Sequence, residues 1–170
     1  GPNEEAPCWG LPADKGDDNT MLNAAAILAF MIASGPLSAE EKNSVFIGHY
    51  GTTIDYPDGL RTVNALFGDE ADEIVVLKGP SGDSYFVRIC SKAARPGQDA
   101  KSLARDIVAD AKARGLALKP VQAGKGIIAY HAPEAESYQL LQEKKEYVYQ
   151  SGGKNLKIAL SLLIWLLEVK

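Results

Sequence analysis

The chain has 170 residues, of which 46% are hydrophobic and 24% charged, a composition that fits one globular domain and excludes intrinsic disorder. Its 22 acidic residues outnumber its 18 basic residues, for a net charge of −4. This balance argues against a nucleic-acid-binding protein, because such proteins concentrate Lys and Arg on one face.

The first twenty residues differ in character from the rest of the chain. Gly1-Pro2 resembles the remnant of a cleaved purification tag. Residues 3–20 contain prolines, glycines and an acidic pair, which disfavour helix and predict an irregular leader. We therefore expect a single folded domain over residues 21–170.

Residues 21–33 are an uncharged apolar run that ends before Ser34-Gly35-Pro36. One interpretation is a secretory signal, because a small-residue segment like a cleavage site follows the run. The other is a buried helix that Gly35-Pro36 terminates, and the absence of a positively charged region before the run favours it. The run is too short for a transmembrane helix, which needs about 20 apolar residues.

The next part of the chain has the composition of β-strands separated by turns. Tyr56-Pro57-Asp58-Gly59 is typical of a tight turn, with Pro at the second position. Residues 79–83 predict a five-residue hairpin loop. In the strand that follows, we expect Tyr85, Val87 and Ile89 to share the buried face. Strands are predicted over residues 45–50, 52–56, 60–67, 73–78 and 84–91.

A helix is predicted over residues 99–114. Its apolar residues recur at the spacing of one helical stripe: Ala100, Leu103, Ala104, Ile107, Val108 and Ala111. Asp99 has the side chain of an N-cap, Asp110 and Arg114 form an i,i+4 pair, and Gly115 suits the position after the helix. Because many stripe residues are alanines, the helix can lie close to a sheet.

The last third of the chain predicts strands, one ambiguous segment and a terminal helix. Strands are expected over residues 118–122 and 126–131. Residues 133–150 are rich in helix-favouring side chains, but Tyr147-Val148-Tyr149 before Ser151-Gly152-Gly153-Lys154 indicates a strand that enters a hairpin turn. A helix from about Asn155 to Val169 is expected. Because residues 162–167 are apolar all round, they should be buried against something.

Strand runs joined by hairpins, with separate helices, predict an α+β fold in which helices pack on the faces of an antiparallel sheet. The segment from Gly51 to Leu60 and the order of elements over roughly residues 44–165 resemble PsbP-like domains. That superfamily includes the extrinsic protein of photosystem II and a Ran-binding import factor. The resemblance implies an α-β-α sandwich that serves as a docking module, mostly without catalysis.

Few residues suggest reaction chemistry. His49, His131 and Cys90 have the side chains of a catalytic metal centre, and Cys90 beside a histidine could act as a nucleophile, so a small hydrolase or metal enzyme is the alternative function. Their spacing matches no metal-binding motif, and we expect no cofactor. Cys8 and Cys90 are either one disulfide or two separate thiols.

The leading interpretation is a non-enzymatic binding or scaffold domain, exported to a bacterial periplasm or an equivalent compartment, that docks on a protein partner. Tyr147, Tyr149 and Trp165 are its candidate partner-binding residues, because aromatic side chains commonly anchor interfaces. The apolar C-terminal segment offers two further modes, contact with a membrane surface and self-association.

Overall fold

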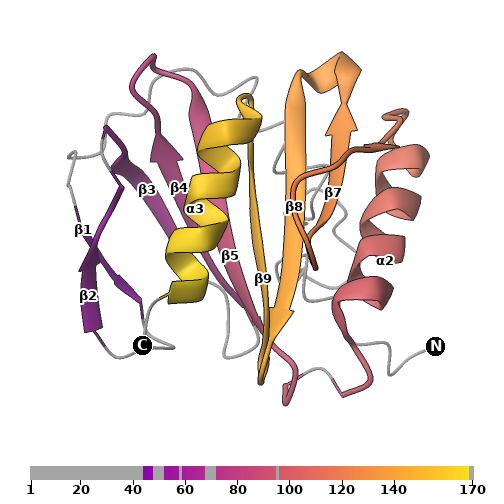
Figure 1. Ribbon diagram of the computed structural model, residues 1–170, viewed down its shortest axis with the longest axis horizontal. Helices are drawn as coiled ribbons and strands as arrows, with labels where there is room; N and C mark the ends of the chain where they lie inside the picture. Colours follow the sequence, from indigo (N-terminus) through magenta and orange to yellow (C-terminus); the bar gives the residue numbers. More distant parts are fainter. Residues whose placement is uncertain (1–43, 48–51, 58, 68–71, 95, 169–170) are drawn as a thin grey trace.

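The computed structural model describes residues 44–47, 52–57, 59–67, 72–94 and 96–168 (Figure 1). The predictions for residues 1–43, including Cys8 and the apolar run 21–33, and that for His49 lie outside this part of the chain.

The described residues form two antiparallel sheets and two α-helices (Figure 1), which confirms the predicted α+β class. β1 (Ser44–Ile47) and β2 (Thr52–Asp55) pair as a small hairpin. The main sheet has the strand order β3-β4-β5-β9-β8-β7-β6, and all its neighbours are antiparallel. Its strands are β3 (Arg61–Phe67), β4 (Asp72–Lys78), β5 (Ser84–Ser91), β6 (Lys119–Pro120), β7 (Ile128–Ala132), β8 (Ser137–Lys144) and β9 (Tyr147–Gly153).

Two predicted turns are present. β4 and β5 are joined by the expected loop 79–83, in which Gly79 N–H donates to Asp83 O at 2.7 Å. The turn after β2 lies one residue later than predicted, because Leu60 N–H donates to Pro57 O at 3.1 Å. Pro57 is thus the first residue of this turn, and Gly59 takes the position that needs a positive φ, at 80°.

Helix α2 (Ala100–Ala113) confirms the prediction from periodicity and caps. The Asp99 side chain accepts from Ser102 N–H at 2.8 Å, and Ser102 Oγ accepts from Asp99 N–H at 2.9 Å. At the other end, Gly115 has a φ of 82° and Leu116 N–H donates to Ala111 O, so the last carbonyls are paired.

The ambiguous segment is a β-hairpin. β8 pairs with β9 from Tyr138 to Lys144, after a short 3₁₀ turn η2 (Pro133–Ala135). The hairpin turn expected over residues 151–154 is wrong, since β9 continues to Gly153 and leads into helix α3 (Leu156–Glu168). The helix-favouring residues of 133–150 become strands because β9 pairs on both sides, with β5 and with β8.

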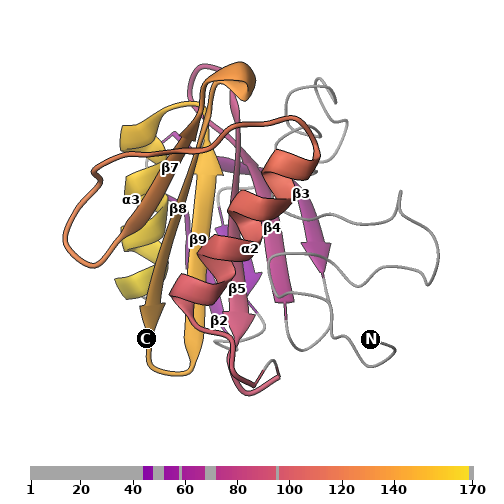
Figure 2. The same ribbon diagram turned by 90° about the vertical axis from the view of Figure 1, so that its right-hand side faces the viewer.

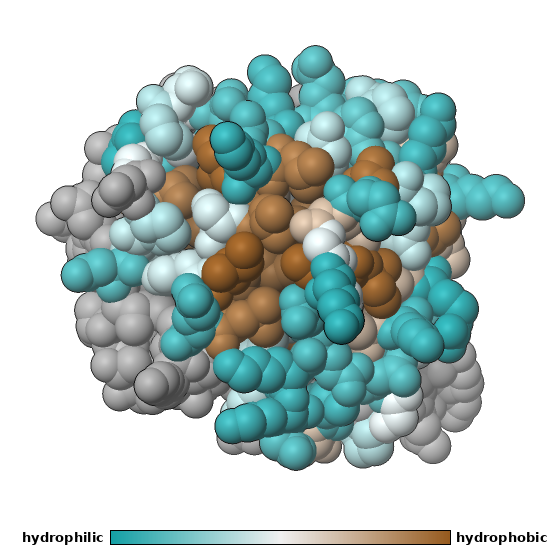
Figure 3. Space-filling view, viewed as in Figure 1, coloured by the Kyte–Doolittle hydropathy of each residue, from teal (hydrophilic) through white to brown (hydrophobic). Residues whose placement is uncertain are grey.

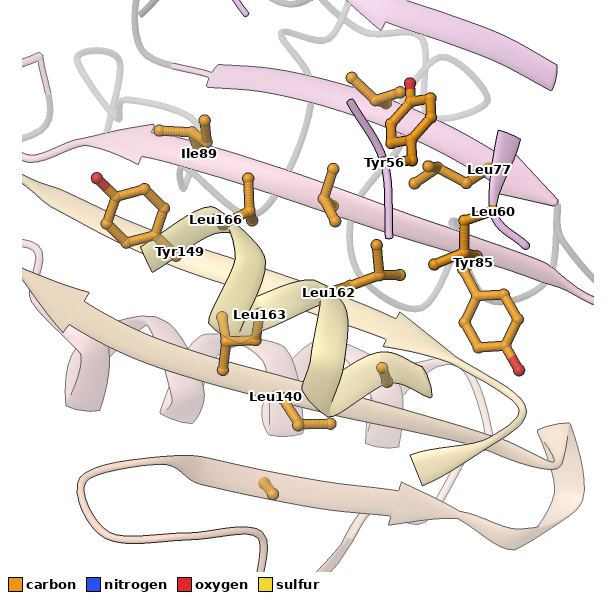
Figure 4. Packing of buried hydrophobic residues seen from close by; sticks show 14 residues of the cluster. Tyr56, Leu60, Leu77, Tyr85, Ile89, Leu140, Tyr149, Leu162, Leu163 and Leu166 are labelled. Carbon is orange, nitrogen blue, oxygen red and sulfur yellow. The ribbon is translucent and has the colours of Figure 1, made fainter. Parts of the chain in front are cut away.

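Helix α3 packs against β5, β8 and β9. Figure 4 shows its buried leucines directed at the sheet, where they meet Ile89, Leu140 and Tyr149. Fully burying a leucine stabilises the fold by about 1.5–3 kcal/mol, so this helix completes the core on its side. Its buried residues follow one helical stripe: Ala159, Leu162, Leu163 and Leu166.

Helix α2 packs against β7 and β8 (Figure 2). Its buried stripe packs in one hydrophobic cluster with Cys90, Leu141 and Val148. The strand neighbours of these three residues belong instead to the hydrophobic cluster under α3, which we call the α3 cluster: Ile89, Leu140 and Tyr149. The prediction that only Tyr85, Val87 and Ile89 of β5 are buried is therefore incomplete. Phe86, Arg88 and Cys90 are also at most 1% exposed, because β5 lies between β4 and β9 and both of its faces are covered.

Candidate functional site

The candidate site lies on helix α3, whose N-terminus is held by two hydrogen bonds. Asn155 caps the helix, since its side chain accepts from Ile158 N–H at 3.1 Å. Its own N–H donates to the Tyr85 hydroxyl at 3.2 Å, which ties the first turn of the helix to β5. Burial raises the pKa of this hydroxyl, so Tyr85 stays neutral.

The sequence of α3 has more apolar residues than the sheet can cover. Leu160, Ile164 and Leu167 follow one another at i, i+4 and i+7, so they lie on one side of the helix, away from the centre of the buried stripe. Leu160 and Leu167 are half-buried and Ile164 is 43% exposed. We call these three residues the α3 strip.

Figure 3 shows the hydropathy of the face on which α3 lies. Hydrophobic residues gather at the centre of the face on which α3 lies, and hydrophilic residues surround them. Exposed Lys157, Ser161 and Glu168 lie on the same helix, and the Lys144 ammonium donates to Leu167 O at its C-terminal end. An apolar centre with a polar rim is the usual composition of a protein-protein contact.

Neither described helix has the combination of length and apolar character that crossing a bilayer requires.

The three aromatic residues predicted to bind a partner lie near α3 but differ in exposure. Tyr149 is 4% exposed and belongs to the core under the helix. Tyr147 and Trp165 are half-buried and pack against the edge of that core. The two tyrosine rings are 6.1 Å apart, whereas Trp165 contacts a different residue, Tyr56, with a ring separation of 5.4 Å.

Trp165 connects α3 with the small hairpin. Its indole N–H donates to Asp55 O, the last residue of β2, at 2.7 Å. Together with the ring contact to Tyr56, this bond fixes the end of β2 beside the helix. The structure thus gives Trp165 an intramolecular contact next to the α3 strip.

The structure does not bring together the described members of the alternative catalytic set. Cys90 lies on β5 in the α2 cluster, whereas His131 lies on β7 and stacks on Tyr138 at 4.3 Å on the α3 side. Three strand spacings separate β5 from β7, about 14 Å, while zinc ligands bond at about 2.0–2.3 Å. Cys90 and His131 therefore cannot share a metal ion or form a nucleophile-base pair in this fold.

Metal-ligating residue types are not gathered elsewhere in the described part of the chain, where no group of three or more His, Cys, Asp or Glu is arranged to hold an ion.

The α3 strip itself was not recognised in the sequence, which indicated that residues 162–167 should be buried and that the apolar C-terminal segment could contact a membrane surface or self-associate. The signal that could have found it is the second apolar stripe of α3. Leu160, Ile164 and Leu167 repeat at helical spacing beside the stripe of Leu162 and Leu166, and one flat sheet covers only one side of a helix.

Comparison of the chain with protein-family models, with curated proteins and with solved structures found no match.

Proposed function

We propose that this protein is a binding domain that docks on a partner protein through the α3 strip. The observation that carries the proposal is Ile164, which is 43% exposed at the centre of the strip and is the one large exposed hydrophobic residue among those whose burial the structure describes. Burying such a side chain against a partner removes apolar area from water, and the polar rim limits the contact to a defined surface.

The chemistry of the strip favours a partner with an amphipathic helix. Leu160, Ile164 and Leu167 form a straight ridge along a 13-residue helix, and such a ridge fits between the side chains of a second helix. Lys157 near the start of α3 and Glu168 at its end would orient that helix through opposite charges.

We propose an α-β-α sandwich as the scaffold for this surface. Two neighbouring residues of β5 support it, because Ile89 packs with α3 and Cys90 packs with α2. Successive side chains of a strand point to opposite faces of the sheet, so the two helices would cover opposite faces. Figure 2, in which α3 and α2 are drawn on either side of β8 and β9, also supports it. The resemblance to PsbP-like domains and export from the cell stay predictions of the sequence.

The test compares Ile164→Asp with Ser161→Asp. Both introduce the same charge on the exposed side of α3, but only the first removes an apolar contact. The partner is first identified by photo-crosslinking from position 160 in the source cells, and its dissociation constant is then measured by calorimetry with purified proteins. We expect Ile164→Asp to weaken binding at least about tenfold, equivalent to about 1.4 kcal/mol, and Ser161→Asp to change it less than about twofold.

Other occupants of the strip would contradict the proposal. A second copy would appear as a dimer by sedimentation that Ile164→Asp dissociates. A membrane surface would appear as binding to anionic lipid vesicles that depends on Ile164. Equal effects of the two substitutions on partner binding would show that the partner uses another face.

A further inference from the structure

The charge around the α3 strip differs in sign from the charge of the whole chain, which is −4. Lys157 is exposed and lies three residues before Leu160 and seven before Ile164, so it lies on the same side of α3 as the strip. Lys154, also exposed, precedes the helix by two residues. Two lysines therefore border the N-terminal end of the strip.

Helix stability does not explain these two lysines. Within the described part of the chain, neither Lys154 nor Lys157 forms an ion pair. The first turn of α3 contains no acidic residue, and a cation at this end of a helix opposes the helix dipole. Their position is thus unfavourable for the helix by itself and becomes favourable when an anionic group binds beside it.

A third lysine lies at the other end of the strip. The Lys144 ammonium donates to Leu167 O, which fixes a positive charge beside the last residue of the strip. An ammonium has three N–H donors, and Lys144 is exposed, so donors stay available to a partner. Both ends of the strip are therefore marked by lysine.

Few carboxylates balance these charges. Glu168 is the one acidic residue of α3, and Asp83 lies near the Tyr85 hydroxyl at the start of the helix. The Glu143 carboxylate is bound at the start of α2, and Asp55 lies on the other flank of α3. Three lysines thus face at most two carboxylates along the strip, which makes its surroundings positive.

We propose that the partner helix is acidic, with carboxylates beside its apolar face that meet Lys144, Lys154 and Lys157; this inference rests on the docking of a helix at the α3 strip. Apolar contact with the strip supplies the affinity. The lysines select the partner, because charges at the rim of an interface attract a helix of opposite sign and repel one of like sign.

Two synthetic helical peptides test the inference. They share the same leucines at i, i+3, i+4 and i+7 spacing, but their polar positions hold glutamate in one and lysine in the other. Fluorescence anisotropy measures the dissociation constant of each with the full chain at low ionic strength. We expect the glutamate peptide to bind at least about tenfold more tightly. The net charge of −4 favours the opposite order, so this preference would report on the local lysines.

Lys157→Glu and Lys101→Glu form a matched pair of variants. Each lysine is exposed and is the second residue of its helix, so the two substitutions change the net charge and the interaction with the helix dipole alike. Only Lys157 borders the strip. Lys157→Glu should reduce the preference for the glutamate peptide at least about fivefold, and Lys101→Glu less than about twofold. Equal effects would overturn the proposal, because net charge would then set the preference.

A third variant separates this inference from the proposed function. Ile164→Ser removes apolar area without adding a charge, so it should weaken the binding of both peptides by a similar factor. If it does so while the lysine peptide binds as tightly as the glutamate peptide, or more tightly, the strip binds helices without selecting acidic ones and only this inference fails. If neither peptide binds, or Ile164→Ser changes neither affinity, the proposed function fails as well.

Discussion

At the scale of single residues, Phe86 and Gly152 pack closely against each other at the centre of the sheet. The two residues are directly paired across β5 and β9, and the Phe86 ring lies in the space that a side chain at position 152 would take. A Cβ atom at position 152 would overlap that ring and would also lie 2.7 Å from Tyr138 O. Glycine is therefore required here by space, not by its backbone conformation.

We predict that Gly152→Ala destabilises the protein by about 1–3 kcal/mol, the usual cost of overpacking a core. Urea unfolding measures this change. Phe86→Leu, combined with Gly152→Ala, should recover part of the loss because the smaller side chain vacates the space. If the free energy of unfolding of the double variant falls by the sum of the decreases in the two single variants, the ring is not the source of the strain.

At the scale of elements, Glu143 of β8 joins the end of β5 to the start of α2. Its carboxylate accepts from the Lys92 ammonium at 2.6 Å and from Ala100 N–H, the first residue of the helix, at 3.0 Å. The hydrogen bond from Lys92, and after it the one from Ala100, holds the pKa of Glu143 below its ordinary value of 4.5. A lowered pKa in the folded state means that the ionised group stabilises the fold above pH 4.5, and this contribution is lost as the pH falls below that value.

Glu143→Gln should accordingly lower the free energy of unfolding at pH 7 by about 1 kcal/mol or less, since the pair is partly exposed and screened by solvent. Between pH 7 and pH 2.5 the difference between the two proteins should shrink, because the wild-type carboxylate takes up a proton as the pH falls below 4.5. Denaturant titrations at both pH values provide the comparison. A difference of the same size at pH 2.5 would show that shape rather than charge is lost.

At the scale of the whole molecule, the described part of the chain contains a seven-stranded sheet and a separate two-stranded hairpin that meet at α3. The hairpin of β1 and β2 is not part of the main sheet, and a two-stranded hairpin is marginally stable alone. The Trp165 bond to Asp55 O and the Tyr56 ring contact are the described side-chain links that hold it against the helix. We therefore predict that the small hairpin depends on these contacts with α3 for its order.

Trp165→Phe keeps an aromatic ring but removes the N–H donor, which leaves Asp55 O without this bond. Loss of one hydrogen bond of about 1 kcal/mol should speed amide exchange in β2 roughly fivefold, while β5 and β9 exchange as before. Hydrogen-exchange mass spectrometry resolves the two regions, and Tyr147→Phe serves as an aromatic control away from the hairpin. Uniformly faster exchange throughout the chain would contradict a local role.

The amino-acid sequence by itself determined the elements whose signals are local. Asp99, the alanine-rich stripe and Gly115 are enough to define α2, because caps and helical periodicity depend on near neighbours. The hairpin through residues 79–83 and the terminal helix were predicted for the same reason.

Only the tertiary structure decided how these elements are arranged. β9 lies between β5 and β8, which places Gln150 beside Arg88, 62 residues away in the chain. No local pattern encodes such a pairing, since it depends on which strands compete for the same edge. The same dependence on strand pairing made residues 137–144 a strand and buried both sides of β5. Ile164 stays at the surface of α3 because the sheet has room for only one side of that helix.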